Sequence, residues 1–207
     1  MPAHPKTADE VVRDLKDGNE RFARGEPRFA VGHKELLAQL ARAQRPYATI
    51  IGCSDSRVAP ELIFDAGLGE LFIIRVAGNV ISPEVMGSIQ YAGVHLKTPL
   101  FVVLGHEGCG AVTAALDAIH RGQQQPSRIQ KLLDDIIPGL AGIEPGLAPD
   151  VELQRGVEAN VRWSIAQLRA TPEVQAREKE GKMKLVGAVF EIATGRVRFL
   201  PGEPAAG

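Results

Sequence analysis

Two cysteines and a histidine stand at the ends of two apolar stretches that predict buried strands. Cys53 closely follows the apolar residues 48–51, and His106 and Cys109 follow the apolar residues 100–104. In open α/β sheets, ligands bind beyond the carboxyl ends of the strands. If the two strands are neighbours, the three side chains meet at one point. Two thiolates and an imidazole there form a zinc site with one position left open.

Asp55 and Arg57 follow the first cysteine at intervals of two residues. A closed structural zinc site has four protein ligands, whereas this chain offers three obvious ones and no third cysteine. The fourth ligand is therefore water or a nearby carboxylate, for which Asp55 is the candidate. An open fourth position is typical of catalytic zinc. Arg57 can hold Asp55 as a bidentate ion pair, although an ordinary ion pair within a loop is the alternative for these two residues.

Simpler interpretations of the cysteines and histidines also have to be weighed. Two cysteines fit one disulfide, which needs an oxidising compartment, or two reduced thiols that act as small apolar side chains. The shared position at strand ends, with His106 three residues before Cys109, favours the metal site. The remaining histidines lie in polar or helical surroundings, and we interpret all four as non-catalytic: His4, His33, His95 and His120.

The composition restricts the class of protein. The chain has 207 residues, of which 44% are hydrophobic, and this predicts a single domain, 1–207, with a substantial core. A net charge of −1 and an aromatic content of 5% argue against nucleic acid and membrane surfaces as partners. No apolar run approaches the ~20 residues of a membrane-spanning helix. We expect a cytoplasmic protein, or a periplasmic one if a signal peptide has been removed.

The order of helical and strand patterns predicts an α/β fold. We expect a mainly parallel central sheet flanked by helices, with an antiparallel edge strand and an amino-terminal helical arm, residues 8–45. Thr7 and Glu10 have the spacing of a capping box at the start of the first helix. The tail, residues 201–207, is predicted to be disordered. The expected strands are 47–53, 71–76, 100–104, 185–192 and 196–200, and the expected helices are 8–24, 33–43, a short one from Pro60, 83–96, 109–121, 129–137, 152–170 and 173–180.

Several motifs together resemble the β-class carbonic anhydrases. The paired signatures are Cys53-Ser54-Asp55-Ser56-Arg57 and His106-Glu107-Gly108-Cys109. The resemblance extends over nearly the whole chain, through Leu15-Lys16-Asp17-Gly18-Asn19-Glu20-Arg21-Phe22, Ala77-Gly78-Asn79, Ser88-Ile89-Gln90-Tyr91-Ala92, Gly187-Ala188-Val189-Phe190 and Thr194-Gly195-Arg196-Val197.

This resemblance implies a function and a set of roles. Zinc would be held by Cys53, His106 and Cys109, with Asp55 and Arg57 as a catalytic dyad beside it. The reaction would be the reversible hydration of CO₂ to bicarbonate and a proton, by attack of zinc-bound hydroxide. Asp55 would accept a hydrogen bond from the zinc-bound water, or become the fourth zinc ligand in a closed, inactive state. The family also implies a homodimer or homotetramer in which the first helix embraces a neighbouring subunit.

One subgroup of that family is regulated by bicarbonate, and this sequence departs from it. Members of the subgroup carry Trp and Tyr at the positions that hold Ile50 and Phe190 here, although Arg75 resembles the subgroup's basic residue. We therefore expect no second bicarbonate pocket.

Two other functions remain open at this stage. Some relatives of the fold hydrolyse carbonyl sulfide or carbon disulfide, which are linear like CO₂. A closed site with Asp55 as a permanent fourth ligand would instead suit a structural zinc centre in a binding or sensor module. The Asp55–Arg57 pair argues against that module, since a permanent ligand needs no competing partner.

Overall fold

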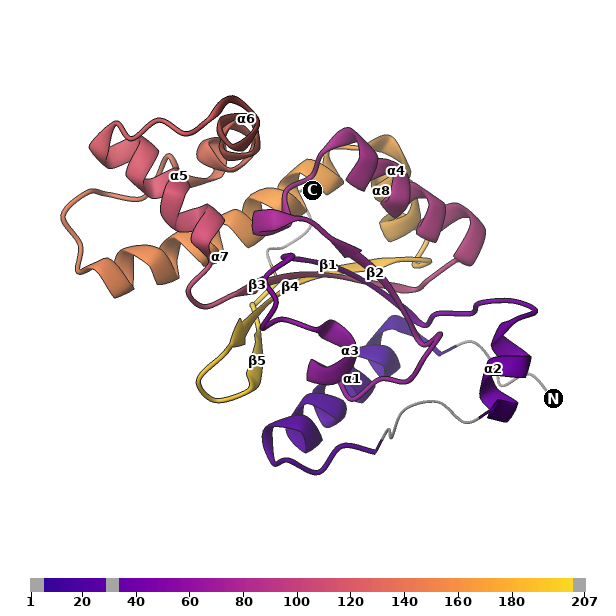
Figure 1. Ribbon diagram of the computed structural model, residues 1–207. Helices are drawn as coiled ribbons and strands as arrows, with labels where there is room; N and C mark the ends of the chain where they lie inside the picture. The colour runs from indigo at the N-terminus through magenta and orange to yellow at the C-terminus, as the bar shows by residue number, and fades with distance from the viewer. Residues whose placement is uncertain (1–5, 29–33, 203–207) are drawn as a thin grey trace.

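A five-stranded sheet forms the centre of the molecule (Figure 1). The structure is a computed structural model that describes residues 6–28 and 34–202. The strands lie in the order β2-β1-β3-β4-β5. They are β1 (Ala48–Gly52), β2 (Leu71–Arg75), β3 (Leu100–His106), β4 (Lys184–Glu191) and β5 (Arg196–Phe199).

Pairing between the strands confirms the predicted mixed sheet. The pairs of β1 with β2, β1 with β3 and β3 with β4 are parallel, and only β5 runs antiparallel, at the edge beside β4. Every residue of β1 and β3 is buried, as expected of central parallel strands covered on both faces. Because β1 and β3 are neighbours with Gly52 opposite Leu104, their carboxyl ends lie side by side.

Helices cover both faces of the sheet (Figure 1). One face carries α4 (Pro83–Tyr91), α5 (Gly110–Arg121), α6 (Ser127–Ile136), α7 (Pro149–Arg169) and α8 (Pro172–Lys179). The other carries α1 (Ala8–Ala23) and α3 (Pro60–Ile63), with α2 (Lys34–Leu40) beyond them. Successive strand residues point to opposite faces, so Ile51 and Val103 enter the first apolar core while Ile50 and Val102 enter the second.

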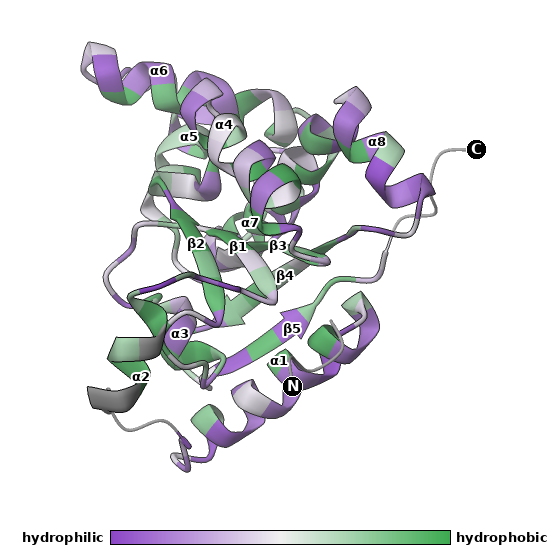
Figure 2. Cartoon of the chain, turned by 90° about the vertical axis from the view of Figure 1, so that its right-hand side faces the viewer, coloured by the Kyte–Doolittle hydropathy of each residue, from purple (hydrophilic) through white to green (hydrophobic). Residues whose placement is uncertain are grey.

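Helix α1 packs on the sheet of its own chain. Thr7 and Glu10 form the predicted capping box, in which each side chain meets the other residue's backbone N–H. Val11 and Leu15 are fully buried against α3 and the strands, while polar residues line much of the remaining helix surface (Figure 2). Contact of α1 with a second subunit therefore stays a prediction.

The main departures from the predicted elements have local causes. The helical arm expected over 8–45 is helical at 8–23 and 34–40 within the described residues, and Pro46 disfavours helix in the residue before it. The helix predicted for 83–96 ends as α4 at Tyr91 and continues as a π-helical turn, Ala92–Leu96. Strand β3 extends two residues further than predicted because Gly105 and His106 pair with β4. Most of the tail predicted to be disordered, 203–207, lies outside the described residues, as do His4 and His33.

Helix α7 packs so closely on the sheet that two strand positions facing it have room only for glycine. A Cβ atom on Gly105 would lie 2.7 Å from Cγ2 of Val161, and one on Gly187 would lie 2.8 Å from Cγ1 of the same valine. At 21 residues α7 is the longest helix described, yet among the described helices none is both long and apolar enough to cross a bilayer. The close approach brings α7 against the carboxyl end of β3, where Gly105 directly precedes His106.

Candidate metal centre

The three predicted metal ligands meet at the carboxyl ends of β1 and β3. Cys53 directly follows β1, His106 is the last residue of β3, and Cys109 immediately precedes α5. Their ligand atoms all lie within 4.8 Å of one another, and the three residues are 5%, 0% and 2% exposed. Both cysteines are free thiols, so the disulfide alternative is wrong for this fold.

The histidine at this point lacks one partner that its burial demands. Nδ1 of His106 lies 2.8 Å from the carbonyl oxygen of Glu107, which orients the ring. Nε2 is buried and has no hydrogen-bond partner among the described residues. A buried ring nitrogen left unpaired is costly, whereas a metal ion at this point would pair it and both sulfurs at once. The residues present therefore fit a zinc ion.

The ionisation of the two thiols also fits a metal. A hydrogen bond from Cys109 lowers the pKa of Cys53 below the usual thiol value, and contacts with His106 and the Gly78 N–H add to this effect. The same contact with Cys53, together with burial, raises the pKa of Cys109. The thiolate form is thus favoured at Cys53 and disfavoured at Cys109, and a cation between the two sulfurs would favour the thiolate form of both.

His106 is subject to opposing influences. Burial lowers its pKa, but Cys53, the Glu107 carbonyl and Asp55 together outweigh burial, and the net effect is a raised pKa. These neighbours favour the protonated ring, although no hydrogen bond joins Nε2 to any of the described residues. With metal, the His106 imidazole and the Cys53 thiolate both act as ligands.

Asp55 and Arg57 form the predicted ion pair at the edge of this centre. The Arg57 guanidinium donates to both carboxylate oxygens, from Nε to Oδ1 at 2.9 Å and from Nη2 to Oδ2 at 2.7 Å. These hydrogen bonds hold the pKa of Asp55 well below its usual value. Oδ2 of Asp55 lies 4.0 Å from Nε2 of His106. The carboxylate therefore stays charged beside the centre while Arg57 restrains it.

Arg75, at the end of β2, holds the backbone between the first cysteine and Asp55. Its Nε donates to the carbonyl of Cys53 at 2.8 Å, and its Nη2 donates to the carbonyl of Asp55 at 2.6 Å. Arg75 is the one charged residue in an otherwise apolar strand, and that exception is a sequence signal for a role at the strand end. The sequence did not indicate that the role would be fixing this loop.

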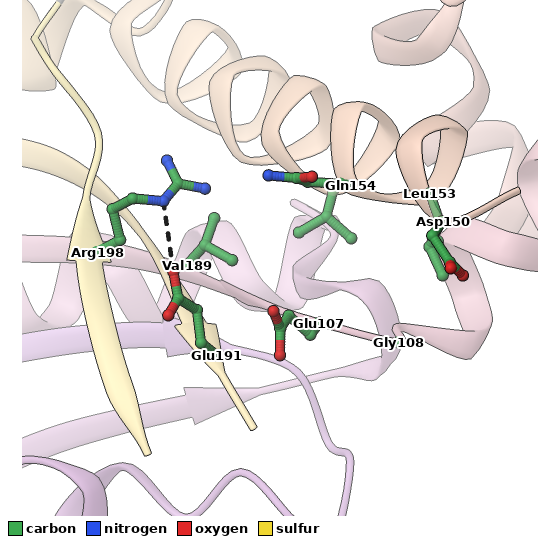
Figure 3. A pocket seen from close by; sticks show the side chains of 9 residues that line it. Glu107, Gly108, Asp150, Leu153, Gln154, Val189, Glu191 and Arg198 are labelled. Atoms are coloured by element: carbon green, nitrogen blue, oxygen red, sulfur yellow. Dashed lines mark ion pairs between the residues drawn. The ribbon is translucent and has the colours of Figure 1, made fainter. Parts of the chain in front are cut away.

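The loop between His106 and Cys109 also borders a cavity of about 270 Å³ on the α7 side of the sheet (Figure 3). Figure 3 shows Glu107 and Gln154 directed toward it and Arg198 beside Glu191. Within the described part of the chain, the cavity's lining includes none of the three metal-ligand candidates. The cavity therefore lies behind the ligand loop and apart from the metal position.

The positions that mark the bicarbonate-regulated subgroup are filled by core residues. Ile50 is fully buried and Phe190 is 3% exposed, both in the apolar core under α1. Phe190 packs against Phe22, with ring centroids 6.4 Å apart. Arg75, the residue that resembles the subgroup, is already engaged by two carbonyls. The absence of a second bicarbonate site stays a prediction.

The other described histidines lie away from the centre. His95 is exposed and stacks against Tyr91. His120 is bound to Glu152 and to the carbonyl of Ile143. Neither joins the metal-ligand group formed by the described residues, and their non-catalytic interpretation stays a prediction.

Comparison with known proteins adds independent findings. The sequence profile of the family described as carbonic anhydrase matches residues 48–197. A carbonic anhydrase of Mycolicibacterium smegmatis is 42% identical over 188 residues, which cover 89% of each chain. Carbonic anhydrase 2 of Mycobacterium tuberculosis is 43% identical over 184 residues, which cover 88% of this chain and 87% of that one. The solved structure of the beta-carbonic anhydrase CcaA matches 92% of this chain and 93% of its own, with a TM-score of 0.75 and 26% identity.

Proposed function

We infer that this chain, which belongs to the β class of the carbonic anhydrase family, catalyses the zinc-dependent, reversible hydration of CO₂ to bicarbonate and a proton. One observation of the site carries the inference. The buried Nε2 of His106 faces two cysteine sulfurs without a hydrogen-bond partner among the described residues, and a charged carboxylate stands 4.0 Å away. This is the donor set of a catalytic zinc site with room for a reactant.

We assign the metal to Sγ of Cys53, Nε2 of His106 and Sγ of Cys109. Zinc held there supplies a Lewis acid that makes a nucleophile available from water near neutral pH. The two cysteine thiolates carry one negative charge each, so together they neutralise the double positive charge of the zinc ion. The immediate surroundings of the ligands are apolar, with Ile51, Val103 and Val112 in the same core, and this excludes bulk water from the ligand side.

Asp55 acts as the hydrogen-bond acceptor that orients the reactant. Because Arg57 donates to both of its oxygens, the carboxylate remains ionised and keeps a fixed direction. An ionised carboxylate accepts hydrogen bonds and donates none. Oδ2 therefore binds an oxygen that carries a proton, and the hydrogen bond fixes the orientation of that oxygen at the centre. Arg57 is thus the residue that positions Asp55. In a closed state, Asp55 would leave Arg57 and serve as a fourth ligand.

The assay that tests this function measures CO₂ hydration by the protein with one zinc per chain, with carbonyl sulfide tried as a second substrate. We expect rapid CO₂ hydration that disappears when the zinc is removed by a chelator and returns when zinc is added. Hydrolysis of carbonyl sulfide without CO₂ hydration would favour the alternative substrate class. Full zinc content with neither activity would favour a structural zinc centre.

We further propose that the enzyme works as a homodimer or homotetramer. Large apolar side chains are exposed on α3, in the loop before β2, on α4 and in the π-helical turn that follows it, and they offer apolar area to a second subunit. They include Leu62 at 67%, Leu68 at 50%, Tyr91 at 46% and Val94 at 56% exposure. Sedimentation of the zinc-loaded protein tests this, and a monomer at micromolar concentration would contradict it.

A cytoplasmic location is part of the same proposal. Both thiols must stay reduced to bind zinc, and a reducing compartment provides that condition. Localisation of the tagged full-length protein in its own cell tests this, and a periplasmic signal would contradict it.

A further inference from the structure

A buried amide on α7 is connected to the first cysteine through a single glycine. Nδ2 of Asn160 donates a hydrogen bond to the carbonyl oxygen of Gly78 at 2.8 Å. The N–H of Gly78 in turn donates to Sγ of Cys53 at 3.3 Å. Asn160 is 1% exposed, and among the described residues its amide donates to Gly78 and to none of the three ligands. Its hydrogen-bond connection to the centre therefore runs through the Gly78 backbone.

The glycine lies in a turn whose shape leaves little freedom. The short helical turn Ala77–Asn79 has Gly78 at φ 66° and ψ 19°, in the left-handed region that favours glycine. A Cβ atom at this residue would also lie 2.6 Å from Cδ1 of Ile136. Since φ and ψ of Gly78 fix the angle between its two peptide planes, holding its carbonyl also sets where its N–H points.

A second polar residue on α7, Ser164, holds the same turn through hydrogen bonds to other residues than that glycine. Oγ of Ser164 lies 3.2 Å from the carbonyl oxygen of Asn79 and 3.0 Å from that of Asn160. Ser164 is as deeply buried as Asn160, at 1% exposure, and lies one helical turn further along. It stabilises the turn but has no hydrogen bond to Gly78. Ser164 is therefore the matched control for Asn160.

The surroundings of Asn160 would otherwise suit an apolar side chain. Its neighbours on the helix, Val157 and Val161, belong to the apolar core. An apolar residue at this position would leave the buried carbonyl of Gly78 without its donor, and the two peptide planes that meet at Gly78 would lose this restraint. The amide is thus the feature of α7 that keeps the Gly78 N–H directed at the sulfur.

We propose that Asn160 is a positioning residue of the metal centre, which holds the Gly78 peptide so that its N–H donates to the Cys53 thiolate. The inference rests on the proposed zinc site at Cys53, His106 and Cys109. An N–H donor withdraws electron density from the sulfur, so the bound metal remains a stronger Lewis acid. The same hydrogen bond stabilises the anionic form of the ligand, and groups that orient ligands in this way affect metal affinity.

The experiment compares three proteins loaded with cobalt(II), whose sulfur-to-metal charge-transfer band reports on the thiolates. They are the parent, Asn160→Leu and Ser164→Ala. In Asn160→Leu the band should move to lower energy because the sulfur has lost its donor, and zinc affinity in chelator competition should fall by about 10- to 100-fold. In Ser164→Ala the band should stay in place and affinity should change by less than about 3-fold. Thermal unfolding of all three proteins measures how much each substitution lowers stability, so that a loss of stability is not mistaken for an effect on the metal centre.

Several outcomes would overturn the proposal. An unshifted band and unchanged affinity in Asn160→Leu would show that the amide is merely structural, and equal changes in both variants would show the same. If Asn160→Leu does not fold, Asn160→Ser replaces it, because a hydroxyl is too short to reach the Gly78 carbonyl and the same shift is expected. A parent protein that binds no cobalt or zinc would instead defeat the proposed function itself.

Discussion

The two ends of α5 each have a histidine nearby, the fully buried His106 and the partly buried His120, and the two rings have opposite surroundings. At the carboxyl end of the helix, Nδ1 of His120 lies 2.5 Å from Oε1 of Glu152 and Nε2 lies 3.1 Å from the carbonyl oxygen of Ile143. Just before the amino end, Nδ1 of His106 lies against a carbonyl, but its Nε2 meets two sulfurs and no hydrogen-bond partner among the described residues.

The difference separates a structural histidine from a ligand. The side chain of His106 is fully buried and that of His120 is 10% exposed, so burial alone distinguishes them only weakly. His120 ties α5 to α7 and to the segment between α6 and α7 through two satisfied nitrogens, and needs nothing more. The free nitrogen of His106 would cost about 1–3 kcal/mol if nothing ever bound it. An unsatisfied ring nitrogen that lies beside two buried thiols therefore indicates the ligand, and the following changes test that distinction.

The largest effect should come from removing a ligand. His106→Leu leaves only two thiols at the centre, so zinc content should fall from one per chain to nearly none and CO₂ hydration should fall by orders of magnitude. Zinc is measured by mass spectrometry of the purified protein. Cys109→Ser should behave in the same way, because a hydroxyl is a far poorer zinc ligand than a thiolate. Either protein with full zinc and full activity would break the assignment.

A large effect with the metal retained is expected for Asp55→Asn. The amide keeps the shape of the side chain but loses the charge that Arg57 restrains, so CO₂ hydration should fall by about 100-fold or more. Zinc content should stay at one per chain. Loss of zinc in this variant would make Asp55 a structural ligand and would favour the closed zinc site.

A moderate effect on stability alone should follow from His120→Leu. Glu152 would be left buried without its partner, which should lower the free energy of unfolding by about 3 kcal/mol. Zinc content and hydration rate should remain near those of the parent, measured below the unfolding transition. The double variant His120→Leu/Glu152→Leu should recover part of the lost stability. Loss of zinc in His120→Leu would show that His120 also supports metal binding, which would contradict its assignment as a structural residue.

The smallest effect is a pH dependence of the Asp55–Arg57 pair. Hydrogen bonds from Arg57 hold the pKa of Asp55 below its ordinary value of 3.8, so the folded state favours the carboxylate. The pair therefore stabilises the fold above about pH 4 and loses this contribution as the pH falls through the lower folded-state pKa. Urea unfolding of the zinc-free parent and Asp55→Asn should show a stability difference that is constant from about pH 6 to 5 and shrinks below about pH 4. A difference that grew on acidification would contradict the direction of the shift.

The sequence by itself determined the fold class and the candidate ligands. Each ligand stands at or just beyond the end of an apolar strand, and parallel strands bring such ends to one edge of a sheet. The spacing of Asp55 and Arg57 also predicted their ion pair, because residues two apart in a loop can meet without help from the rest of the fold. Local patterns suffice where the contact is local or where strand order alone creates it.

Only the tertiary structure decided how the centre is held. Asn160 and Gly78 are separated by 82 residues in sequence, and Arg75 follows Cys53 by 22. Neither relation has a sequence pattern, because the docking of α7 against the turn Ala77–Asn79 and the pairing of β2 with β1 create them. The same holds for the histidine of α5. His120 is a satisfied structural residue because Glu152 and the carbonyl of Ile143, which are 32 and 23 residues away, pack against its two nitrogens.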